Sequence, residues 1–334
     1  LAGCGGISNA WLTPAANIKD LEIVGLVDLK KANTTRVQEK YGLDDAVTGT
    51  DLAKVIKETK PDAVFDCTIP EAHVDVVTTA FKHGCHVLGE KPLADSMANA
   101  RKMVKAGQKA GKIYSVIQNR RYQPAARRVH NLLHSGKLGE MHTVDCDFYL
   151  GPHFGGFRDV MQHVLLLDMA IHTFDMARFL TEADPVKVYC KEFNPKGSWY
   201  KHGASAVAVF EMSGGMVYTY RGSWCAQGCG TTWECDWRFG CTKGSARWDG
   251  AESIQAQALA PTKKEPYRMK EIAAPKSAPK DKQGGHDGLL REFVRCVQTG
   301  RQPETRGDDN IKSLAMVFGA IESAKVGKEI KVKI

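Results

Sequence analysis

Hydrophobic and polar positions follow two different patterns along the chain, and the pattern changes near residue 119. The first third repeats short apolar runs followed by helical stretches, beginning with LEIVGLVDL at residues 21–29. Apolar runs of this kind are typical of parallel strands that are buried on both faces. Repeated strand–helix units predict a doubly wound parallel sheet with right-handed crossovers. Strands are predicted at 21–29, 46–48, 63–67, 86–88 and 113–118, and helices at 31–41, 51–58, 70–83 and 96–110.

After residue 119 the pattern favours antiparallel strands. Helical patterns at 123–135 and 165–180 flank a long strand at 140–150. Between residues 186 and 259 successive alternating runs, from VKVYCKEF to SIQAQAL, are typical of a sheet built from meanders. An exposed loop with a short strand is predicted at 262–283, and helices at 287–298 and 309–326. We therefore predict an α/β protein with two domains, 1–119 and 120–334.

Length and charge fit this organisation. A chain of 334 residues is long for one ordinary domain and normal for two. The net charge of +8 is dispersed and forms no basic tail or nucleic-acid motif, so we expect a slight preference for anionic ligands and no nucleic-acid partner. No apolar run is long enough to span a bilayer, and the first residues show no signal peptide. We expect no membrane partner.

The ten cysteines are scattered and contain no Cys-x-x-Cys pair, which favours reduced thiols and a cytoplasmic location. The group from Cys225 to Cys241 has spacings of four, six and six residues. These spacings suit inward positions of strands better than a zinc site. No metal site is expected.

A glycine-rich turn stands at the beginning of the sequence. Gly3 and Gly5 have the spacing of a dinucleotide-binding turn, in which one glycine allows a tight reversal and the next lets backbone approach a pyrophosphate. Ser8 occupies the third position, where the pattern usually has Gly or Ala. Such a turn follows a strand, and only Leu1 and Ala2 precede it, so we expect the native chain to carry more residues upstream.

Asp28 ends the second predicted strand, 25 residues after Gly3. An acid at this place accepts hydrogen bonds from an adenosine ribose and repels a 2′-phosphate. The other interpretation is a helix-capping or surface acid, and the glycine turn upstream favours the ribose. Lys30, Lys31 and Arg36 leave NADP open as the cofactor.

Two further segments follow predicted strands and lie at the same edge of the sheet, where open α/β sheets bind their ligands. Thr68 and Ile69 are placed to touch a cofactor, whereas His73 is equally well explained as an ordinary residue of a helix face. Glu90 and Lys91 end the next strand, and the lysine there points toward a nicotinamide. A surface ion pair is the alternative for Lys91, although its place between a buried strand and a proline is unusual for a surface lysine.

The segment 168–175 carries a polar stripe on an otherwise apolar helix. Asp168, His172 and Asp175 stand at positions i, i+4 and i+7 and share one helix face. Buried acids and histidines need a partner or a function. A structural Asp–His pair and a catalytic pair are both open on this pattern alone.

Arginine and aromatic residues accompany the predicted domain junction and the loop before this helix. They suit a polyhydroxylated or acidic small molecule, and most of the tryptophans are better explained by packing. The arginines leave uronic acids open as substrates. These residues are Asn119, Arg120, Arg121, Tyr122, His153, Phe154, Arg158, His163, Trp199, Trp224, Trp233 and Trp237.

The order of these motifs resembles the glucose-fructose oxidoreductase / inositol dehydrogenase (Gfo/Idh/MocA) family over essentially the whole chain. The motifs are the glycine turn, Asp28, the segment 68–73, Glu90-Lys91-Pro92 and Asp168-x-x-x-His172. The resemblance implies a Rossmann domain followed by a substrate-binding α+β domain with a large open-faced, mostly antiparallel sheet. It also implies a homodimer or homotetramer formed through that sheet.

The resemblance assigns roles to individual residues. His172 is the implied acid/base, Lys91 contacts nicotinamide and substrate, and Asp168 positions the substrate. The expected cofactor is NAD, with NADP possible. Residues expected to contact it are Gly3, Gly5, Gly6, Ile7, Asp28, Leu29, Thr68, Ile69, His73, Glu90, Lys91 and Asn119, and residues expected to contact substrate are Lys91, Tyr122, Arg158, Asp168 and His172.

The function implied is reversible oxidation of a secondary or anomeric alcohol of a sugar, anhydrosugar or cyclitol, with hydride passing to nicotinamide C4. Two alternatives remain open. One is a glycosidase or lyase that keeps NAD bound as a transient oxidant, and the other is a dinucleotide-sensing regulator without catalysis. The presence of Lys91, Asp168 and His172 counts against the regulator.

Overall fold

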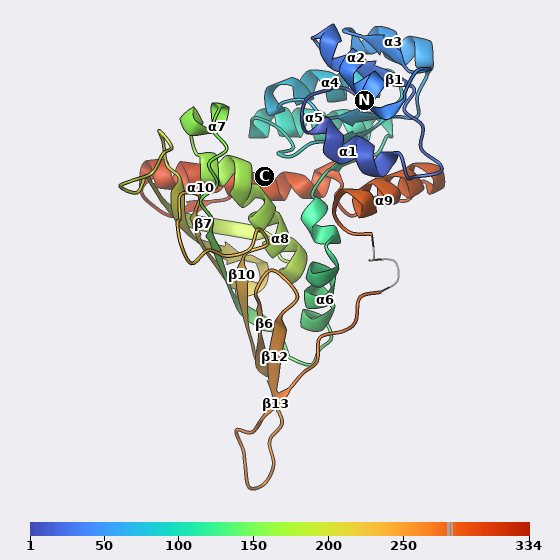
Figure 1. The fold of residues 1–334 in the computed structure, drawn as a ribbon. Coiled ribbons are helices and arrows are strands. Elements are labelled where there is room, and N and C mark those ends of the chain that lie inside the picture. The colour runs from blue at the N-terminus through green and yellow to red at the C-terminus, as the bar shows by residue number, and fades with distance from the viewer. Residues whose placement is uncertain (279–280, 282) are drawn as a thin grey trace. The chain divides into compact units, whose positions relative to one another are not determined.

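The computed structural model describes residues 1–278, 281 and 283–334, which form two compact units. The first unit comprises Leu1–Tyr122 and Gln283–Leu314, and the second comprises Gln123–Lys282 and Ala315–Ile334. The chain therefore leaves the first unit after residue 122 and returns to it for residues 283–314 (Figure 1). The predicted second domain, 120–334, differs from this division in the returning segment.

Parallel strands form the sheet of the first unit. Ala2 makes parallel bridges to both Val27 and Asp66, which joins a two-stranded and a three-stranded ladder. The strand order is therefore β2, β1, Ala2, β3, β4, β5, and it reverses at Ala2. Ligands of open α/β sheets bind beyond the carboxyl ends of the strands at such a reversal. The strands are β1 (Gly25–Val27), β2 (Val47–Gly49), β3 (Ala63–Asp66), β4 (His86–Gly89) and β5 (Tyr114–Val116).

Capping residues set the ends of several helices in the first unit. Asp51 accepts the Lys54 N–H and Ser96 accepts the Asn99 N–H, while Gly42 and Gly111 end their helices in the left-handed conformation. The helices are α1 (Ser8–Ala15), α2 (Lys31–Tyr41), α3 (Leu52–Thr59), α4 (Pro70–Lys82), α5 (Met97–Ala110), α9 (Gly285–Thr299) and the 3₁₀-helix η1 (Asn119–Tyr122).

Helix α9 explains why residues 283–314 belong to the first unit. Its apolar face contributes Leu289, Leu290 and Phe293 to the same hydrophobic core as Trp11 and Phe65. The Phe65 and Phe293 rings lie 6.0 Å apart. Burial of each of these three large side chains stabilises the packing by about 1.5–3 kcal/mol. Residues 283–314 therefore belong to the first unit, although they follow the second unit in the sequence.

A nine-stranded sheet forms the framework of the second unit, in the order β13-β12-β11-β10-β6-β9-β8-β7-β14. Every neighbouring pair is antiparallel except β6 and β9, which run parallel. The predicted fold class is confirmed. The strands are β6 (Met141–Tyr149), β7 (Pro185–Phe193), β8 (Ser205–Met212), β9 (Val217–Ser223), β10 (Asp236–Cys241), β11 (Gly244–Trp248), β12 (Ile254–Leu259), β13 (Met269–Glu271) and β14 (Ile330–Lys331).

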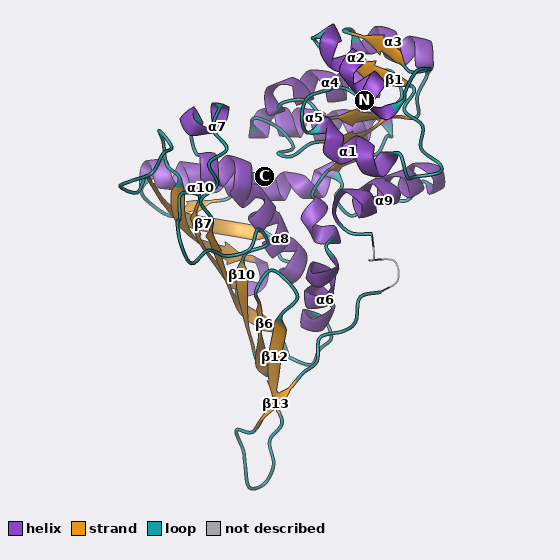
Figure 2. Cartoon of the chain, viewed as in Figure 1, coloured by secondary structure: helices purple, strands orange, loops and turns teal. Residues whose placement is uncertain are grey.

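One face of this sheet packs against helices. The Phe174 ring of α8 (Ile171–Thr181) meets the rings of Phe210 and Tyr220 edge-to-face at 5.0 and 5.2 Å. Helices α6 (Pro124–Leu133) and α8 lie on the same side of the strands (Figure 2). On the other face, Val207 and Val209 of β8 are exposed. The remaining helices that contribute to this unit are α7 (Phe157–Val160), the 3₁₀-helix η3 (Ser213–Gly215) and part of α10 (Gly307–Val326).

The structure corrects two predicted elements and adds a short strand. The strand predicted at 21–29 is only Gly25–Val27, because Leu21 and Ile23 pack against the core without joining a ladder. The helix predicted at 165–180 begins as a π-helix, η2 (Leu165–Ala170), before α8. The short strand β14 was not predicted at all, since two residues carry no readable alternation.

No helix within the described residues is long and apolar enough to cross a membrane. All ten cysteines are free, and most are buried. Burial raises the pKa of the Cys4 thiol in the glycine-rich turn to about 11, so this thiol stays protonated and inert at neutral pH.

Candidate active site

Gly3 occupies a position that only glycine fits. Its φ is +87°, and a Cβ there would lie 2.6 Å from the Cys67 carbonyl oxygen. The Gly3 N–H donates to Val27 at 2.8 Å, so the turn is held against both neighbouring strands. The glycine-rich turn therefore begins at the reversal of the sheet.

The next part of the turn is shaped for an anion. A Cβ added to Gly5 or Gly6 would meet no protein atom within 4 Å, so the backbone is open on this side. Within the described part of the chain, the N–H groups of these two glycines have no protein acceptor. Helix α1 begins directly afterwards at Ser8, and a helix N-terminus together with open N–H groups favours phosphate. The turn fits the pyrophosphate of a dinucleotide.

Ser8 is the departure from the usual third small residue, and the structure explains it. Its side chain is fully buried, and its hydroxyl donates to the Gly5 carbonyl at 2.6 Å. The hydroxyl thus satisfies itself within the turn at a place where a larger side chain has no room. A serine at this position therefore leaves the conformation of the turn intact.

Asp28 stands beside the turn at the end of β1. Its carboxylate accepts the Cys4 N–H at 2.9 Å, the Lys30 N–H at 2.8 Å and the Asn33 amide at 3.0 Å. Burial acts to raise the pKa of Asp28, but these hydrogen bonds outweigh it and hold the pKa below its ordinary value. Asp28 is therefore an anion at neutral pH, fixed at the place where an adenosine ribose would lie. Arg36 donates to the Cys4 carbonyl at 2.6 Å and brings a cation to the same turn.

Three of the predicted cofactor contacts are apolar side chains that the first unit leaves exposed. Leu29 is 91% exposed, Ile69 is 65% exposed and Ile7 is 42% exposed. All three follow the ends of strands or the glycine turn at one edge of the sheet. Their exposure fits an edge that covers the rings and ribose of a dinucleotide.

Thr68 is held by a buried network beneath this edge. Its hydroxyl and its N–H both reach Asp66, at 2.5 and 3.0 Å, and the His73 Nδ1 lies 2.8 Å from the same carboxylate. His73 is only 1% exposed and Asp66 is fully buried. The structure thus places His73 below the surface, where it holds the Thr68 loop. Sequence reasoning missed Asp66, because it reads as one more residue of a buried strand.

Glu90 links the glycine turn to Lys91. Its buried carboxyl accepts the Trp11 Nε1–H of α1 at 2.7 Å and the Lys91 N–H at 3.1 Å. Burial raises the pKa of Glu90, and these two hydrogen bonds oppose the rise. The Lys91–Pro92 peptide bond is cis. Lys91 therefore stands at the carboxyl end of β4 on a backbone fixed by the helix that follows the turn.

Asn119 and Tyr122 contact the returning helix α9. The Asn119 amide lies 3.1 Å from the His286 Nδ1, and His286 itself lies against Trp11 with ring centroids 6.5 Å apart. Tyr122 is buried in the hydrophobic core and donates to Glu292. The structure thus gives Tyr122, predicted as a substrate contact, a packing position. Sequence reasoning missed His286, since nothing in the local pattern places α9 beside Trp11.

In the second unit, Asp168 and Arg158 form an ion pair. The Arg158 Nε lies 2.5 Å from an Asp168 oxygen, and the Asp168 side chain is 12% exposed. The guanidinium also lies over the rings of Phe154 and Phe157, at 5.3 and 4.6 Å from their centroids. The structure brings together two residues that were predicted separately as substrate contacts. The two opposite charges neutralise each other beside the Phe154 and Phe157 rings.

His172 is one turn away from Asp168, across the junction between the π-helix and α8. Single π-helical turns are frequent at functional sites. His172 is partly exposed, whereas Asp175 is buried. The predicted stripe is therefore divided: Asp168 and His172 reach the surface, and Asp175 belongs to the interior of the unit.

The loop before this helix carries stacked aromatic rings. His153 stacks on Trp199 with centroids 3.7 Å apart, and Phe154 stacks on Trp233 at 6.2 Å. His163 is bound through its Nδ1 to Glu192 at 2.5 Å. Stacked, partly exposed rings beside polar groups are typical of surfaces that bind sugars and related ligands.

A cavity of about 490 Å³ in the first unit lies away from these residues. It is lined by Leu1, Gly25 and Ala63 at the amino ends of the strands, with Phe293 and Val297 of α9. None of the predicted site residues lines it. We therefore assign the candidate site to the carboxyl ends of the parallel strands, where the glycine turn, Asp28, Thr68 and Lys91 lie.

The glycine turn, Asp28 and Lys91 stand at the carboxyl edge of the parallel sheet, an arrangement that fits a dinucleotide-dependent oxidoreductase of the Rossmann type. Residues 1–118 match the family model described as "Oxidoreductase family, NAD-binding Rossmann fold", and residues 126–247 match "GFO/IDH/MocA C-terminal domain". The chain belongs to the Gfo/Idh/MocA family. It is an NAD(P)-dependent oxidoreductase, and NAD as cofactor is confirmed.

Relatives of known name cover the whole chain. The chain is 22% identical to 1,5-anhydro-D-fructose reductase of Ensifer adhaerens, over 100% of this chain and 98% of the relative. It is 25% identical to D-apiose dehydrogenase of Paraburkholderia graminis, over 100% and 89%. An oxidoreductase from Agrobacterium radiobacter, solved in complex with NAD⁺, L-tartaric acid and magnesium, shares the fold with a TM-score of 0.87 at 21% identity, over 99% and 97% of the two chains.

Proposed function

We propose that this enzyme reversibly oxidises a secondary or anomeric alcohol of a sugar, anhydrosugar or cyclitol. The observation that carries the proposal is the group on the second unit, where His172 and the Asp168–Arg158 pair accompany stacked, partly exposed aromatic rings. NAD supplies the hydride acceptor at nicotinamide C4 when bound. The first unit binds the dinucleotide and the second binds the polyhydroxylated substrate.

Each side chain has a separate task in this proposal. His172 takes the hydroxyl proton, because an imidazole can serve as base in one direction of the reaction and as acid in the other. Lys91 donates a hydrogen bond to the same oxygen as negative charge develops there. Asp168 accepts a hydrogen bond from a neighbouring hydroxyl, and its ion pair with Arg158 fixes its position.

The charge balance supports a neutral substrate over a uronic acid. Arg158 pairs with Asp168, and Arg121 lies 3.8 Å from Asp309, so these two of the three candidate arginines already face an acid. Two of the relatives are named for neutral sugars, anhydrofructose and apiose, whereas the structure from Agrobacterium radiobacter holds an acid, L-tartaric acid. We therefore place sugars, anhydrosugars and cyclitols ahead of acidic sugars.

A panel of neutral sugars, anhydrosugars, cyclitols and uronic acids tests the substrate class. Reduced nicotinamide is followed by absorbance with NAD and with NADP, in both reaction directions. We expect turnover with at least one neutral polyhydroxylated compound. Turnover confined to uronic acids, or to alcohols without neighbouring hydroxyls, contradicts the proposal.

Cofactor choice gives a second prediction. We expect kcat/KM for NAD to exceed that for NADP, because the Asp28 anion repels a 2′-phosphate. Replacing Asp28 with Ser should lower kcat/KM for NAD by about 10- to 150-fold and narrow the ratio of kcat/KM between NAD and NADP, since a lost hydrogen bond to a charged group costs about 1.5–3 kcal/mol. Arg36 remains beside the turn in this variant to receive the phosphate. An unchanged ratio of kcat/KM for NAD to kcat/KM for NADP would show that Asp28 does not bind the ribose.

The exposed face of the sheet supports a homo-oligomer. Tyr189, Val207 and Val209 of β7 and β8 are 40–44% exposed on this face. Large exposed apolar groups in a regular row favour association with a second copy, because a two-fold axis lets the same face cover itself. We expect a dimer or tetramer by light scattering, and a smaller species for Val207→Glu with Val209→Glu. A wild-type monomer contradicts this assignment.

A further inference from the structure

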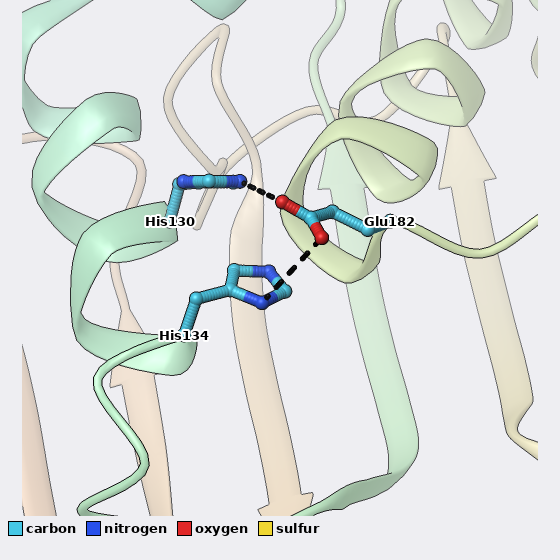
Figure 3. Close-up of side chains that lie close together, drawn as sticks. All are labelled: His130, His134 and Glu182. Carbon is cyan, nitrogen blue, oxygen red and sulfur yellow. Dashed lines mark hydrogen bonds and ion pairs between the residues drawn. The ribbon is translucent and has the colours of Figure 1, made fainter.

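His130, His134 and Glu182 form a cluster on the second unit that the proposed oxidoreductase chemistry does not use (Figure 3). One ligand atom from each residue lies within 4.8 Å of the other two. The cluster lies at the other end of α8 from His172, ten residues and therefore about 15 Å along the helix axis. It contains none of the residues expected to bind dinucleotide or substrate.

We propose that these three residues form a binding site for a divalent zinc ion, with a water molecule as the fourth ligand. Two imidazole nitrogens and one carboxylate are a ligand set that zinc accepts in tetrahedral sites. The site fastens α6 to the end of α8. It is separate from hydride transfer, since the cluster lies at the other end of α8 from His172.

The two histidines are placed by one helix. His130 lies in the last turn of α6, and His134 directly follows the last helical residue, so the i, i+4 spacing brings both side chains to one side of the helix end. Their rings are 4.4 Å apart, and the His130 ring also stacks on Phe179 of α8 at 4.6 Å. The helix backbone and the stacking therefore hold both imidazoles beside each other without a metal.

The third ligand comes from the residue that ends α8. Glu182 has a left-handed backbone with φ of +54°, which turns its side chain back toward α6. One carboxylate oxygen lies 3.0 Å from the His130 Nε2, and the other lies 3.9 Å from the His134 Nδ1. In Figure 3 the carboxylate points between the two rings.

A backbone carbonyl sets the protonation of His134 for metal binding. Its Nε2 lies 3.0 Å from the Leu180 carbonyl oxygen, which can only accept a hydrogen bond. The Nε2 therefore carries the proton, and the Nδ1 lone pair faces Glu182. Metal-binding histidines almost always donate their second ring N–H to an oxygen in this way.

The dimensions and the access suit a small cation. Donor atoms of a tetrahedral zinc site lie about 3.3 Å apart when the metal–ligand distances are near 2.0–2.1 Å. Side-chain rotations that move the donor atoms by about 1–1.5 Å would bring these three residues to that spacing. The side chains are 22%, 29% and 63% exposed for His130, His134 and Glu182, which leaves room to rotate and a route for the ion. The alternative is an ion pair that holds the two helices without a metal.

Zinc binding to the full-length enzyme, first stripped with a chelator, tests the proposal. We measure stoichiometry and affinity by calorimetry, and the melting temperature with and without zinc. Cobalt in place of zinc reports tetrahedral coordination through its visible absorption. We expect one high-affinity zinc per chain, a rise in melting temperature that excess chelator reverses, and a tetrahedral cobalt spectrum.

Variants assign the binding to this cluster. Glu182→Gln and His134→Gln should each weaken zinc binding by about 10- to 100-fold or more, as loss of a ligand costs at least as much as loss of its outer partner. The matched control is His142→Gln, which makes the same change at an exposed histidine of β6 whose ring contacts the neighbouring Thr143. It should bind zinc like the wild type. Equal zinc affinity in the wild type and Glu182→Gln, or no high-affinity zinc in either, overturns the proposal.

Discussion

Replacing His172 with Ala should lower kcat by about 10²–10⁴-fold, because the alcohol then has no side chain to take its proton in the transition state. Replacing Lys91 with Ala should lower kcat by about 10²–10³-fold, the range for a lost hydrogen-bond donor to a developing oxyanion. Both variants should still bind NAD, since the turn and Asp28 remain intact. The measurement is steady-state turnover beside calorimetric titration with NAD.

Two exposed residues provide matched controls. Lys102→Ala removes an exposed lysine on α5, and His142→Ala removes an exposed histidine on β6. Both controls should keep wild-type turnover. The double variant of Lys91 and His172 should lose much less than the product of the single losses, because groups that act on one oxygen are not additive. Wild-type turnover in either single variant removes that residue from the mechanism.

Replacing Gly3 with Ala should destabilise the first unit more than any other single methyl addition in the turn. The left-handed backbone at φ of +87° costs an alanine about 1–2 kcal/mol. The added Cβ would also lie 2.6 Å from a backbone oxygen of Cys67, and overpacking of this kind costs about 1–3 kcal/mol more. We expect a fall in the free energy of unfolding by urea of about 2–5 kcal/mol, and weaker NAD binding.

Gly42→Ala separates the two causes. Gly42 has a φ of +62° but no atom within 4 Å of an added Cβ, so only the backbone cost of about 1–2 kcal/mol applies. It ends α2, outside the turn, and NAD affinity should stay unchanged. If the two variants lose equal stability, the contact between the turn and Cys67 is not what fixes the glycine.

Local patterns were sufficient to predict most of the elements. The helix at 31–41 matches because Gly42 stops it, and Ser96 and Asp51 mark helix starts through their own hydrogen bonds. Glycine spacing and strand ends predicted the turn and the residues after β3 and β4, since parallel strands bring all their carboxyl ends to one edge. These are short-range signals, and the sequence carries them directly.

What the sequence could not show depends on contacts between distant segments. The returning helix α9 reads as an ordinary amphipathic helix, and its pattern does not say that it covers Trp11 rather than the following sheet. The burial of Tyr122 depends on that helix. The π-helical turn at 165–170 keeps the apolar content of an α-helix, so periodicity does not reveal it. The i, i+4 spacing of His130 and His134 is visible in the sequence. Their neighbour Glu182 follows a different helix, α8, and only the fold brings it to them.

The ratio of NAD reduced to substrate consumed tests the central claim most directly. With the best neutral substrate of the panel, we expect one reduced nicotinamide to accumulate for each molecule of substrate oxidised, and the reverse reaction to consume both in the same ratio. Substrate consumed while the nicotinamide returns to its starting state would instead show a transient oxidant in a glycosidase or lyase. That result would contradict the assignment of this enzyme as a dehydrogenase of polyhydroxylated alcohols.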